Sequence, residues 1–563
     1  MSFLPPFDGL PHALARRLLI GGSGPGLAPA RAAALAAGPS AAPLADALGL
    51  AVWEGAPFWP EAAALAVSSA APLAPTLAVA ARAVAEAASR PAVADPYFDR
   101  LAARRDIPKL VHYLLSRHEK VPDDPTPLYR LSVFAPMALG PAGGGELYER
   151  ARDVFSGLSG ALHPLGALTA AGLDLLAGRC AAARDACLAL LSAFPSAAAR
   201  LLLAEALVRL GDRDGAVAAL AAVVAARPWD VLALGRLHDL ACGADTAVAK
   251  LPGSLAVLLY SYNNARLLDA TLACLADTDW GFAPAGGGPR LFALDNGSGD
   301  DTAAVLAAWR ERLAGRLEVV PLPVNVGAPA ARNWLLRLPG VRAREFTAFF
   351  DDDAFAPPDW LGRLGAAVAA RPEAGVWGCR IVGRDAPAFV QCADSHLLPT
   401  PREEGGFGRA FDLASPWLVT PDWGQYAQLR PCATVTGCCH LFCRDVFDAV
   451  GDFDIRFSPT QYDDLDHDLR LLLAGKVPVC QGHLAVVHAK ATGAASLPGG
   501  VNYGFGFANQ FKLHHKYDDA AVARAADTAF AALAADAAAK RHVVEGLGLA
   551  GGGARDGEGG HGR

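Results

Sequence analysis

Short apolar runs alternate with helical segments along the second half of the chain, and this alternation is the strongest constraint on its fold. The dipeptide Pro252-Gly253 is a turn signal just before the first run. The expected strands are residues 255–260, 291–294, 317–322 and 346–350, with helices between them at about 264–275, 298–313 and 328–338. Strands joined in turn by helices form a mostly parallel sheet that is covered on both faces. We therefore predict an α/β domain that begins near residue 254.

Three consecutive carboxylates, Asp351, Asp352 and Asp353, follow directly on the last of these strands. The carboxyl ends of strands in open α/β sheets are where ligands bind. Clustered carboxylates repel one another and raise each other's pKa unless a cation neutralises them. Hard divalent cations such as Mg²⁺ and Mn²⁺ prefer these ligands and are often shared with substrate phosphates. The triplet indicates a divalent metal site, with a solvated acidic turn as the alternative.

The first 250 residues have a different character, because they are rich in Ala and Leu and contain few strand-like runs. We expect them to be mostly helical. A weak repeat of 33 residues relates Gly178, Ala183 and Pro195 to Gly211, Ala216 and Pro228. Two helices in each unit resemble a tetratricopeptide repeat, whose period is about 34 residues. An ordinary pair of helical hairpins is the alternative.

Bulk composition excludes some classes of protein. The net charge of −7 gives no case for a nucleic-acid partner. No window offers about 20 residues of bilayer-grade hydrophobicity, and the N-terminal segment lacks the pattern of a secretory signal. We expect a cytoplasmic protein, with peripheral attachment at the inner face of the membrane as a further expectation.

The eleven cysteines are odd in number and irregularly spaced, which favours reduced thiols over a disulfide framework. A cluster made of Cys432, Cys438, Cys439, His440 and Cys443 raises the question of zinc. However, no paired CxxC stands at zinc-finger distance. A strand with small, buried side chains is the favoured interpretation.

Several short motifs follow one another between residues 254 and 495, and their order resembles a family 2 glycosyltransferase of the GT-A fold. The motifs are Ser261-Tyr262-Asn263, Leu294 to Asp300, Asn325 to Asn333, Asp351-Asp352-Asp353, Gly437 to Asp454, Tyr462 to Arg470, and His488. The resemblance implies an α/β catalytic domain with a Rossmann-like mixed sheet that binds a nucleotide-diphosphate sugar, preceded here by an all-α domain.

The resemblance also implies roles for individual residues. The donor would contact Ser261, Tyr262, Asn263, Asp295, Asn296, Arg332, Asp351 and Asp352. Asp353 and His488 would hold Mn²⁺ or Mg²⁺, with His483 as the competing histidine. Asn296 stands where the family more often has Asp, which leaves the nucleobase open.

The segment Tyr462 to Arg470 is similar to the family's E-D-x-D-L-x-x-R motif, with Asp463 in place of Glu. The family's catalytic base corresponds to Asp464. A carboxylate at the start of a helix can take the proton of an attacking hydroxyl. Acids at this position are also ordinary helix caps.

The implied activity is inverting, metal-dependent transfer of a sugar to a hydroxyl of a glycan, lipid-linked or protein acceptor, as in polysaccharide biosynthesis. The helical N-terminal region would dock a protein partner. The rival hypothesis is a non-catalytic scaffold on a degenerate GT-A fold. The expected divisions are helical regions at 1–160 and 161–250, the GT-A domain at 254–518, a helix at 519–550 and a disordered tail at 551–563.

Overall fold

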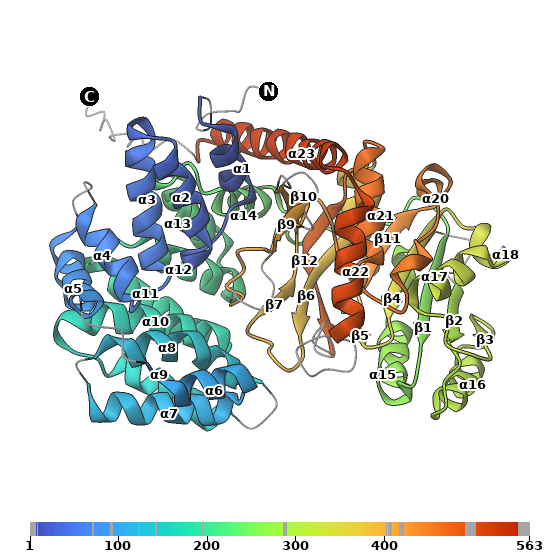
Figure 1. Cartoon of the computed structure of the whole chain (residues 1–563), viewed down its shortest axis with the longest axis horizontal. Coiled ribbons are helices and arrows are strands. Elements are labelled where there is room, and N and C mark those ends of the chain that lie inside the picture. The colour runs from blue at the N-terminus through green and yellow to red at the C-terminus, as the bar shows by residue number, and fades with distance from the viewer. Residues whose placement is uncertain are drawn as a thin grey trace, which may run out of the picture. The chain divides into compact units, whose positions relative to one another are not determined.

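A computed structural model describes most of the chain (Figure 1). The described residues are 7, 9–69, 73–89, 94–122, 124–140, 144–193, 195–284, 290–400, 402, 408–415, 421–489 and 503–549. The predicted disordered tail at 551–563 lies outside these residues.

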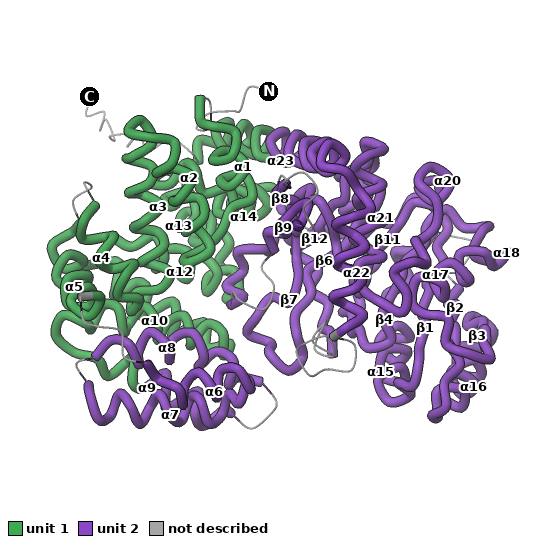
Figure 2. Tube along the Cα trace, in the orientation of Figure 1, with its two compact units in different colours: residues 1–91, 154–242, 537–563 green, residues 92–153, 243–536 purple. Residues whose placement is uncertain are grey.

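The chain divides into two compact units, which Figure 2 shows in different colours. The first unit comprises residues 1–91, 154–242 and 537–563, and the second comprises residues 92–153 and 243–536. Neither unit is a single continuous stretch. The domain boundaries drawn from the sequence stay predictions.

The described part of residues 1–250 is helical and contains no strand, as predicted. Its α-helices are α1 (His12–Ile20), α2 (Ala28–Ala36), α3 (Ala42–Glu54), α4 (Pro60–Ser68), α5 (Pro75–Ala85), α6 (Pro96–Arg104), α7 (Ile107–Lys120), α8 (Pro125–Phe134), α9 (Gly145–Ser156), α10 (His163–Leu176), α11 (Cys180–Ala193), α12 (Ala197–Leu210), α13 (Arg213–Ala226) and α14 (Val231–Cys242).

Helices α10 to α14 form a run in which each helix packs against the next. Gly178 and Gly211 follow α10 and α12 with φ of 78° and 83°, a left-handed conformation that favours glycine. The helix after each of these glycines begins two residues later, at Cys180 and at Arg213. The 33-residue recurrence in the sequence therefore corresponds to repeated helical hairpins. Their assignment as tetratricopeptide repeats stays a prediction.

The second half of the chain forms one large mixed sheet with the order β10-β12-β6-β11-β4-β1-β2-β3. Its strands are β1 (Leu255–Ser261), β2 (Arg290–Asp295), β3 (Leu317–Pro321), β4 (Phe346–Asp351), β6 (Val376–Gly383), β10 (Leu429–Pro431), β11 (Cys439–Cys443) and β12 (Val479–His488), with β5 (Ala354–Phe355) beside β12 and β7 (Val390–Cys392) beside β6. Strand β1 pairs in parallel with β2 and β4, whereas β11 runs antiparallel to β4 and β6. A separate hairpin pairs β8 (His396–Pro399) with β9 (Phe411–Ala414).

Both faces of the sheet are buried. In β1, Val257 and Leu259 belong to one hydrophobic core, while Ala256 and Leu258 belong to another. Successive side chains of a strand point to opposite faces, so a strand with two buried faces reads as a continuous apolar run. The helices of this half are α15 (Ala265–Ala276), α16 (Thr302–Arg312), α17 (Ala328–Arg337), α18 (Pro339–Arg342), α19 (Trp360–Ala370), α20 (Asp445–Val450), α21 (Asp463–Leu473), α22 (Tyr503–Lys516) and α23 (Asp519–Gly546).

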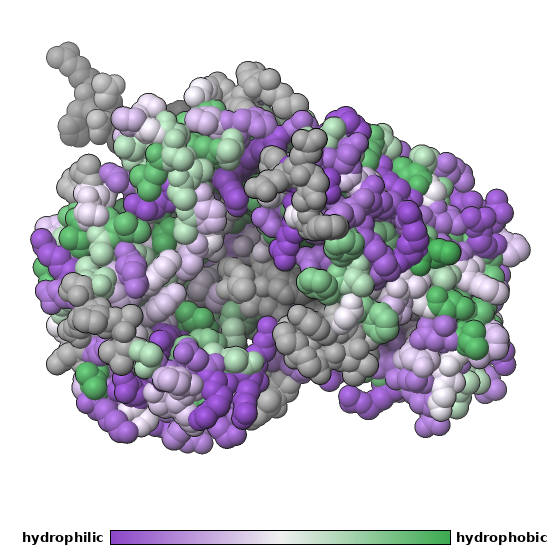
Figure 3. All heavy atoms as spheres, viewed as in Figure 1, coloured by the Kyte–Doolittle hydropathy of each residue, from purple (hydrophilic) through white to green (hydrophobic). Residues whose placement is uncertain are grey.

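The surface seen in Figure 3 carries hydrophobic residues in small groups among hydrophilic ones. Within the described residues, no helix has the length and apolar character needed to cross a membrane.

His467 of α21 is buried in an aromatic cluster at one face of the sheet. Its ring centroid lies 5.3 Å from those of Phe442 and Phe447 and 4.9 Å from that of Phe453. The ring contacts the carbonyl oxygen of Gly451 through Nε2 at 3.2 Å. Burial, together with the positive charge of Arg470, lowers the pKa of His467 to about 3. The folded protein therefore holds this imidazole neutral.

We predict that His467→Phe reduces the acid sensitivity of the fold. The unfolded chain binds a proton at this histidine below its ordinary pKa of 6.5, whereas the folded chain does not until about pH 3. Stability is therefore lost as the pH falls through this range, by about 2 kcal/mol at about pH 5. Phe removes this loss, and Arg470 Nη1 still donates to the Gly451 carbonyl at 3.3 Å. Urea unfolding at neutral pH and at about pH 5 measures the free energy of unfolding of both proteins. The prediction is wrong if the stability of the variant relative to wild type does not rise between neutral pH and about pH 5.

Candidate active site

The parallel strands bring polar residues to one edge of the sheet, as the sequence predicted. Ser261 at the end of β1 pairs with Asp295 at the end of β2, and Tyr260 pairs with Asp351 at the end of β4. Parallel strands end on the same side of a sheet, so the loops after β1, β2 and β4 meet there. The residues expected to bind the donor lie in or beside these loops, or on α17.

The turn after β1 is joined to the turns after β4 and β2. The Ser261 hydroxyl donates to Asp352 Oδ2 at 2.5 Å. Asn263 has a left-handed φ of 51°; its N–H donates to Ser298 Oγ at 3.0 Å, and its Oδ1 accepts from the Gly299 N–H at 2.7 Å. Tyr262 between them is 48% exposed, so its ring is open to a ligand.

Asp295 and Asn296 are both buried and both engaged by backbone groups. Asp295 Oδ1 accepts from the Ser298 N–H at 2.9 Å. Asn296 Oδ1 accepts from the Val326 N–H at 2.9 Å, and its Nδ2 donates to Asn325 Oδ1 at 3.0 Å. These contacts tie the end of β2 to the segment before α17.

Arg332 of α17 is 4% exposed and lies among acids. Its Nη1 donates to Asp463 Oδ2 at 2.6 Å, and its Nη2 is 3.8 Å from Asp351 Oδ1. A Cβ at Gly437 would stand 2.5 Å from Nη2, so only glycine fits beside this guanidinium. The resemblance implied that Arg332 contacts the donor, and the structure shows two acids within reach of its guanidinium.

Asp351 ends β4, His488 ends β12 and Cys438 directly precedes β11, and these three residues lie close together. One ligand atom from each of these residues lies within 4.8 Å of the other two. His488 Nε2 is 3.0 Å from Asp353 Oδ1 and 3.8 Å from Asp351 Oδ2. Gln391 Nε2 lies 3.0 Å from His488 Nδ1, which turns Nε2 toward the carboxylates. The competing histidine, His483, is not a member of this group.

The charges of this cluster suit a cation. Burial raises the pKa of Asp351 to about 7; Arg332 and His488 oppose this effect, while Asp353 and Asp352 add to it. A divalent ion would offset the repulsion among these carboxylates. Carboxylate oxygens and an imidazole nitrogen are ligands that Mn²⁺ accepts, so the residues present fit the expected metal.

Three of the four acids in α21 are engaged by other side chains. Asp463 is paired with Arg332. Asp466 contacts Lys516 Nζ at 2.5 Å and the Tyr517 hydroxyl at 2.8 Å. Asp468 Oδ2 accepts from Thr434 Oγ1 at 2.7 Å.

Asp464 differs from these three, because among the described residues it accepts hydrogen bonds only from backbone N–H groups. The donors are Gly437 N at 2.9 Å and Leu465 N at 2.8 Å. Gly437 directly precedes Cys438 of the metal cluster. Asp464 is also only partly buried. Within the part of the chain that the structure describes, this carboxylate therefore forms no ion pair, and the nearby charge of Arg332 acts on it only through space.

Sequence reasoning missed Asn509 of α22, which supports the turn before Asp464. Gln461 and Tyr462 in this turn have left-handed φ values of 75° and 70°. Asn509 is 1% exposed, and its Nδ2 donates to the carbonyl oxygens of Phe457 at 2.6 Å and Thr460 at 2.8 Å. Asn509 lies outside every motif, so no pattern in the chain pointed to it.

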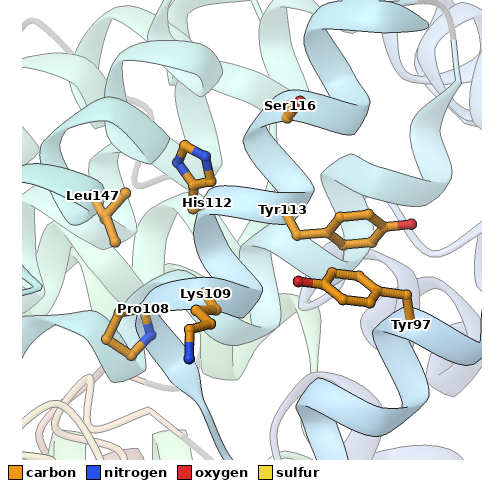
Figure 4. Close-up of a pocket in the computed structure, with 7 residues that line it drawn as sticks. All are labelled: Tyr97, Pro108, Lys109, His112, Tyr113, Ser116 and Leu147. Atoms are coloured by element: carbon orange, nitrogen blue, oxygen red, sulfur yellow. The ribbon is translucent and has the colours of Figure 1, made fainter.

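A pocket of about 500 Å³ lies among helices α6, α7 and α9, far from these motifs in sequence (Figure 4). Its lining residues are Tyr97, Pro108, Lys109, His112, Tyr113, Ser116 and Leu147. Lys109 Nζ is paired with Asp106 at 2.8 Å, and the Tyr113 hydroxyl donates to Asp95. This pocket offers no cluster of carboxylates, so we place the chemistry at the sheet edge.

Comparison with known proteins agrees with this placement. Residues 256–451 match the family model described as Glycosyl transferase family 2. The O-antigen biosynthesis protein RfbC of Myxococcus xanthus is 26% identical over 199 residues, which are 35% of this chain and 14% of that protein. The chain thus spans a small part of that relative's length.

Solved structures of three transferases also show similarity. GalNAc-T7 with UDP, GalNAc and Mn²⁺ has a TM-score of 0.33 at 12% identity, covering 42% of this chain and 43% of that one. Mannosyltransferase PcManGT from Pyrobaculum calidifontis, in complex with GDP-Man and Mn²⁺, has a TM-score of 0.30 at 19% identity, covering 57% and 92%. TarS of S. aureus has a TM-score of 0.28 at 16% identity, covering 42% and 37%.

The family match begins within β1 and extends past β11, so it contains the strand ends that carry Asp295 and Asp351. The mixed sheet and the helices before it agree with the GT-A fold class and the all-α region that the motifs implied. Over residues 256–451 the chain is a family 2 glycosyltransferase domain.

Proposed function

We propose that this protein transfers a sugar from a nucleotide-diphosphate sugar to an acceptor hydroxyl, with inversion at the anomeric carbon and with a divalent metal. One observation carries the proposal: Asp464 forms no ion pair among the described residues and is bonded to the N–H of Gly437, which directly precedes Cys438 of the group formed with Asp351 and His488. A base and a metal site at adjacent positions are the two components that such a transfer needs.

Asp353 and His488 would hold the metal, Mn²⁺ or Mg²⁺, with Asp351 at its edge. The bound metal supplies positive charge to the diphosphate. Gln391 keeps the His488 ring oriented, because its amide lies at Nδ1 and leaves Nε2 for the metal side.

The donor would lie across the loops after β1, β2 and β4. Tyr262 offers an exposed ring for a base, and Asp295, Asn296 and Asp351 lie at neighbouring strand ends. Ser261 would act by fixing Asp352, since the two side chains are bonded to each other. Arg332 would keep its acids oriented rather than meet the phosphates, because it is already paired.

In the transfer, Asp464 would accept the proton of the acceptor hydroxyl. The acceptor oxygen then forms a bond to the anomeric carbon while the bond to the diphosphate oxygen breaks, and the nucleotide diphosphate departs. A single displacement of this kind inverts the anomeric centre. The name of the Myxococcus relative favours a glycan acceptor of a surface polysaccharide, ahead of a lipid-linked or protein acceptor. A protein partner on the helical region remains part of the proposal.

A non-catalytic scaffold is the rival function. A scaffold would not need a carboxylate without an ion pair next to the candidate metal site. Among the described residues, Asp464 is such a carboxylate. Detection of nucleotide diphosphate released from a panel of donors, with Mn²⁺ and Mg²⁺, separates the two functions.

We predict that Asp353→Ala abolishes metal-dependent binding of a nucleotide diphosphate without unfolding the chain. Asp353 is 3% exposed and contacts His488 Nε2. Its loss would remove one proposed metal ligand and also a contact of His488, the other proposed ligand. Loss of a group that only supports a metal ligand costs about 10–100-fold in affinity, so loss of a ligand itself should cost more. Calorimetry with UDP or GDP and Mn²⁺ measures the effect.

The matched control is Asp359→Ala, which removes a carboxylate paired with Arg363 at the start of α19. This control should bind like wild type. If Asp353→Ala keeps full Mn²⁺-stimulated affinity, the metal assignment is wrong.

We predict that Asp464→Asn retains donor binding and loses transfer by about 10² or more, the usual scale for a general base. Asn keeps the size of the side chain and an oxygen for the Gly437 N–H, but it has no basicity. The measurements are donor affinity by calorimetry and turnover with the acceptor that the donor screen identifies.

Asp463→Asn and Asp466→Asn serve as comparisons, because each removes an acid that is paired with a cation. Near-normal transfer by Asp464→Asn, with one of these two inactive, would show that a different carboxylate is the base. A product with the anomeric configuration of the donor, seen by NMR, would exclude the single displacement.

A further inference from the structure

We propose that the Cys438 thiol is a further ligand of the metal at this site, so that the site binds softer divalent ions such as Co²⁺ and Cd²⁺ more tightly than its oxygen and nitrogen ligands alone would. The inference rests on the proposed function, because it concerns the metal that the function requires. It also revises the interpretation of Cys438 from the sequence, where a buried structural thiol was favoured.

The backbone places Cys438 directly opposite Asp351. Strands β11 and β4 are antiparallel, with Cys439 paired to Phe350, and the Asp351 N–H donates to the Cys438 carbonyl at 3.0 Å. Side chains of opposite residues in an antiparallel pair share one face of the sheet, with Cβ atoms about 5 Å apart. The sulfur is within 4.8 Å of ligand atoms of Asp351 and His488.

The Cys438 thiol is buried and makes no hydrogen bond in the described part of the chain. Its residue is 2% exposed. Other buried thiols differ: Cys379 Sγ donates to the Cys439 carbonyl at 3.6 Å, and Cys432 Sγ donates to the Pro478 carbonyl at 3.7 Å. An unpartnered sulfur faces the carboxylate and the imidazole.

The chemistry of sulfur sets the expected selectivity. Thiolates favour softer ions, whereas carboxylates and water suit Mg²⁺ and Mn²⁺. On binding, the thiol proton is released to solvent as the metal–sulfur bond forms. Asp351, Asp353 and the thiolate would then share a divalent ion with neutral His488, and Arg332 lies beside Asp351 as a further positive charge. The three anions exceed the charge of the ion by one, and Arg332 offsets this only in part because it is also paired with Asp463.

Titration of the full-length protein with Co²⁺ alone tests the proposal. Sulfur bonded to Co²⁺ gives a charge-transfer band in the near ultraviolet, and oxygen or nitrogen ligands do not. We expect this band in wild type and its loss in Cys438→Ala. The control is Cys439→Ala, an equally buried neighbour outside the group, which should keep the band. Affinity for Co²⁺ should fall about tenfold or more in Cys438→Ala, with a smaller change for Mg²⁺.

Cadmium NMR of wild type provides a second readout that needs no substitution, because a sulfur ligand moves the Cd²⁺ resonance strongly downfield. Bound Co²⁺ without the band, or a band that survives in Cys438→Ala, overturns the proposal. If wild type also shows metal-dependent transfer, only the thiol ligand is wrong and the proposed function stands. If wild type neither binds Co²⁺ nor transfers sugar with any metal, the proposed function fails and this inference fails with it.

Discussion

The guanidinium of Arg332 lies buried among carboxylates, and the geometry of the site depends on it. It bonds Asp463 and reaches toward Asp351, and the rings of Tyr260 and Phe453 lie 5.5 Å and 5.2 Å from it. These contacts join α17 to the start of α21 and to the end of β4. Removing one partner of a buried ion pair typically costs about 3–5 kcal/mol, because the other charge is left uncompensated. Asp464 follows Asp463 directly, so the ion pair between Arg332 and Asp463 also fixes the position of the proposed base.

The sequence predicted the parts of the fold whose signals are local. Residues 255–260 form an apolar run because both faces of the strand are covered, and this run was identified as a strand. The resemblance implied that one donor contacts both Asp295 and Asp351, and the structure has these residues at one edge of the sheet. They lie together because parallel strands have their carboxyl ends on the same side, whatever the details of packing.

The remainder depends on contacts between residues that are far apart in the chain. Nothing in the local sequence shows that the Asn296 amide is engaged by Asn325 and Val326. The sequence also does not show that Asp464, unlike the other acids of α21, has no side-chain partner among the described residues. The direction of the Cys438 sulfur follows from the register of β11 against β4, which periodicity does not give. The division of residues 1–250 between two units also depends on contacts between distant segments, because residues 92–153 belong to the same unit as residues 243–536.

Asn509 supports the turn at Gln461 and Tyr462, and this support limits where the chain can be divided to make chimeras with related transferases. The family match ends at residue 451, whereas Asp464, His488 and Asn509 all lie beyond it. The strand ends where we propose that the donor binds, and helix α22 with Asn509, are thus separate stretches of chain. A chimera that exchanges the loops after β1 and β2 would leave the base and its support intact. One that ends the domain at β12 would keep Asp464 and lose the side chain that holds its turn in a left-handed conformation.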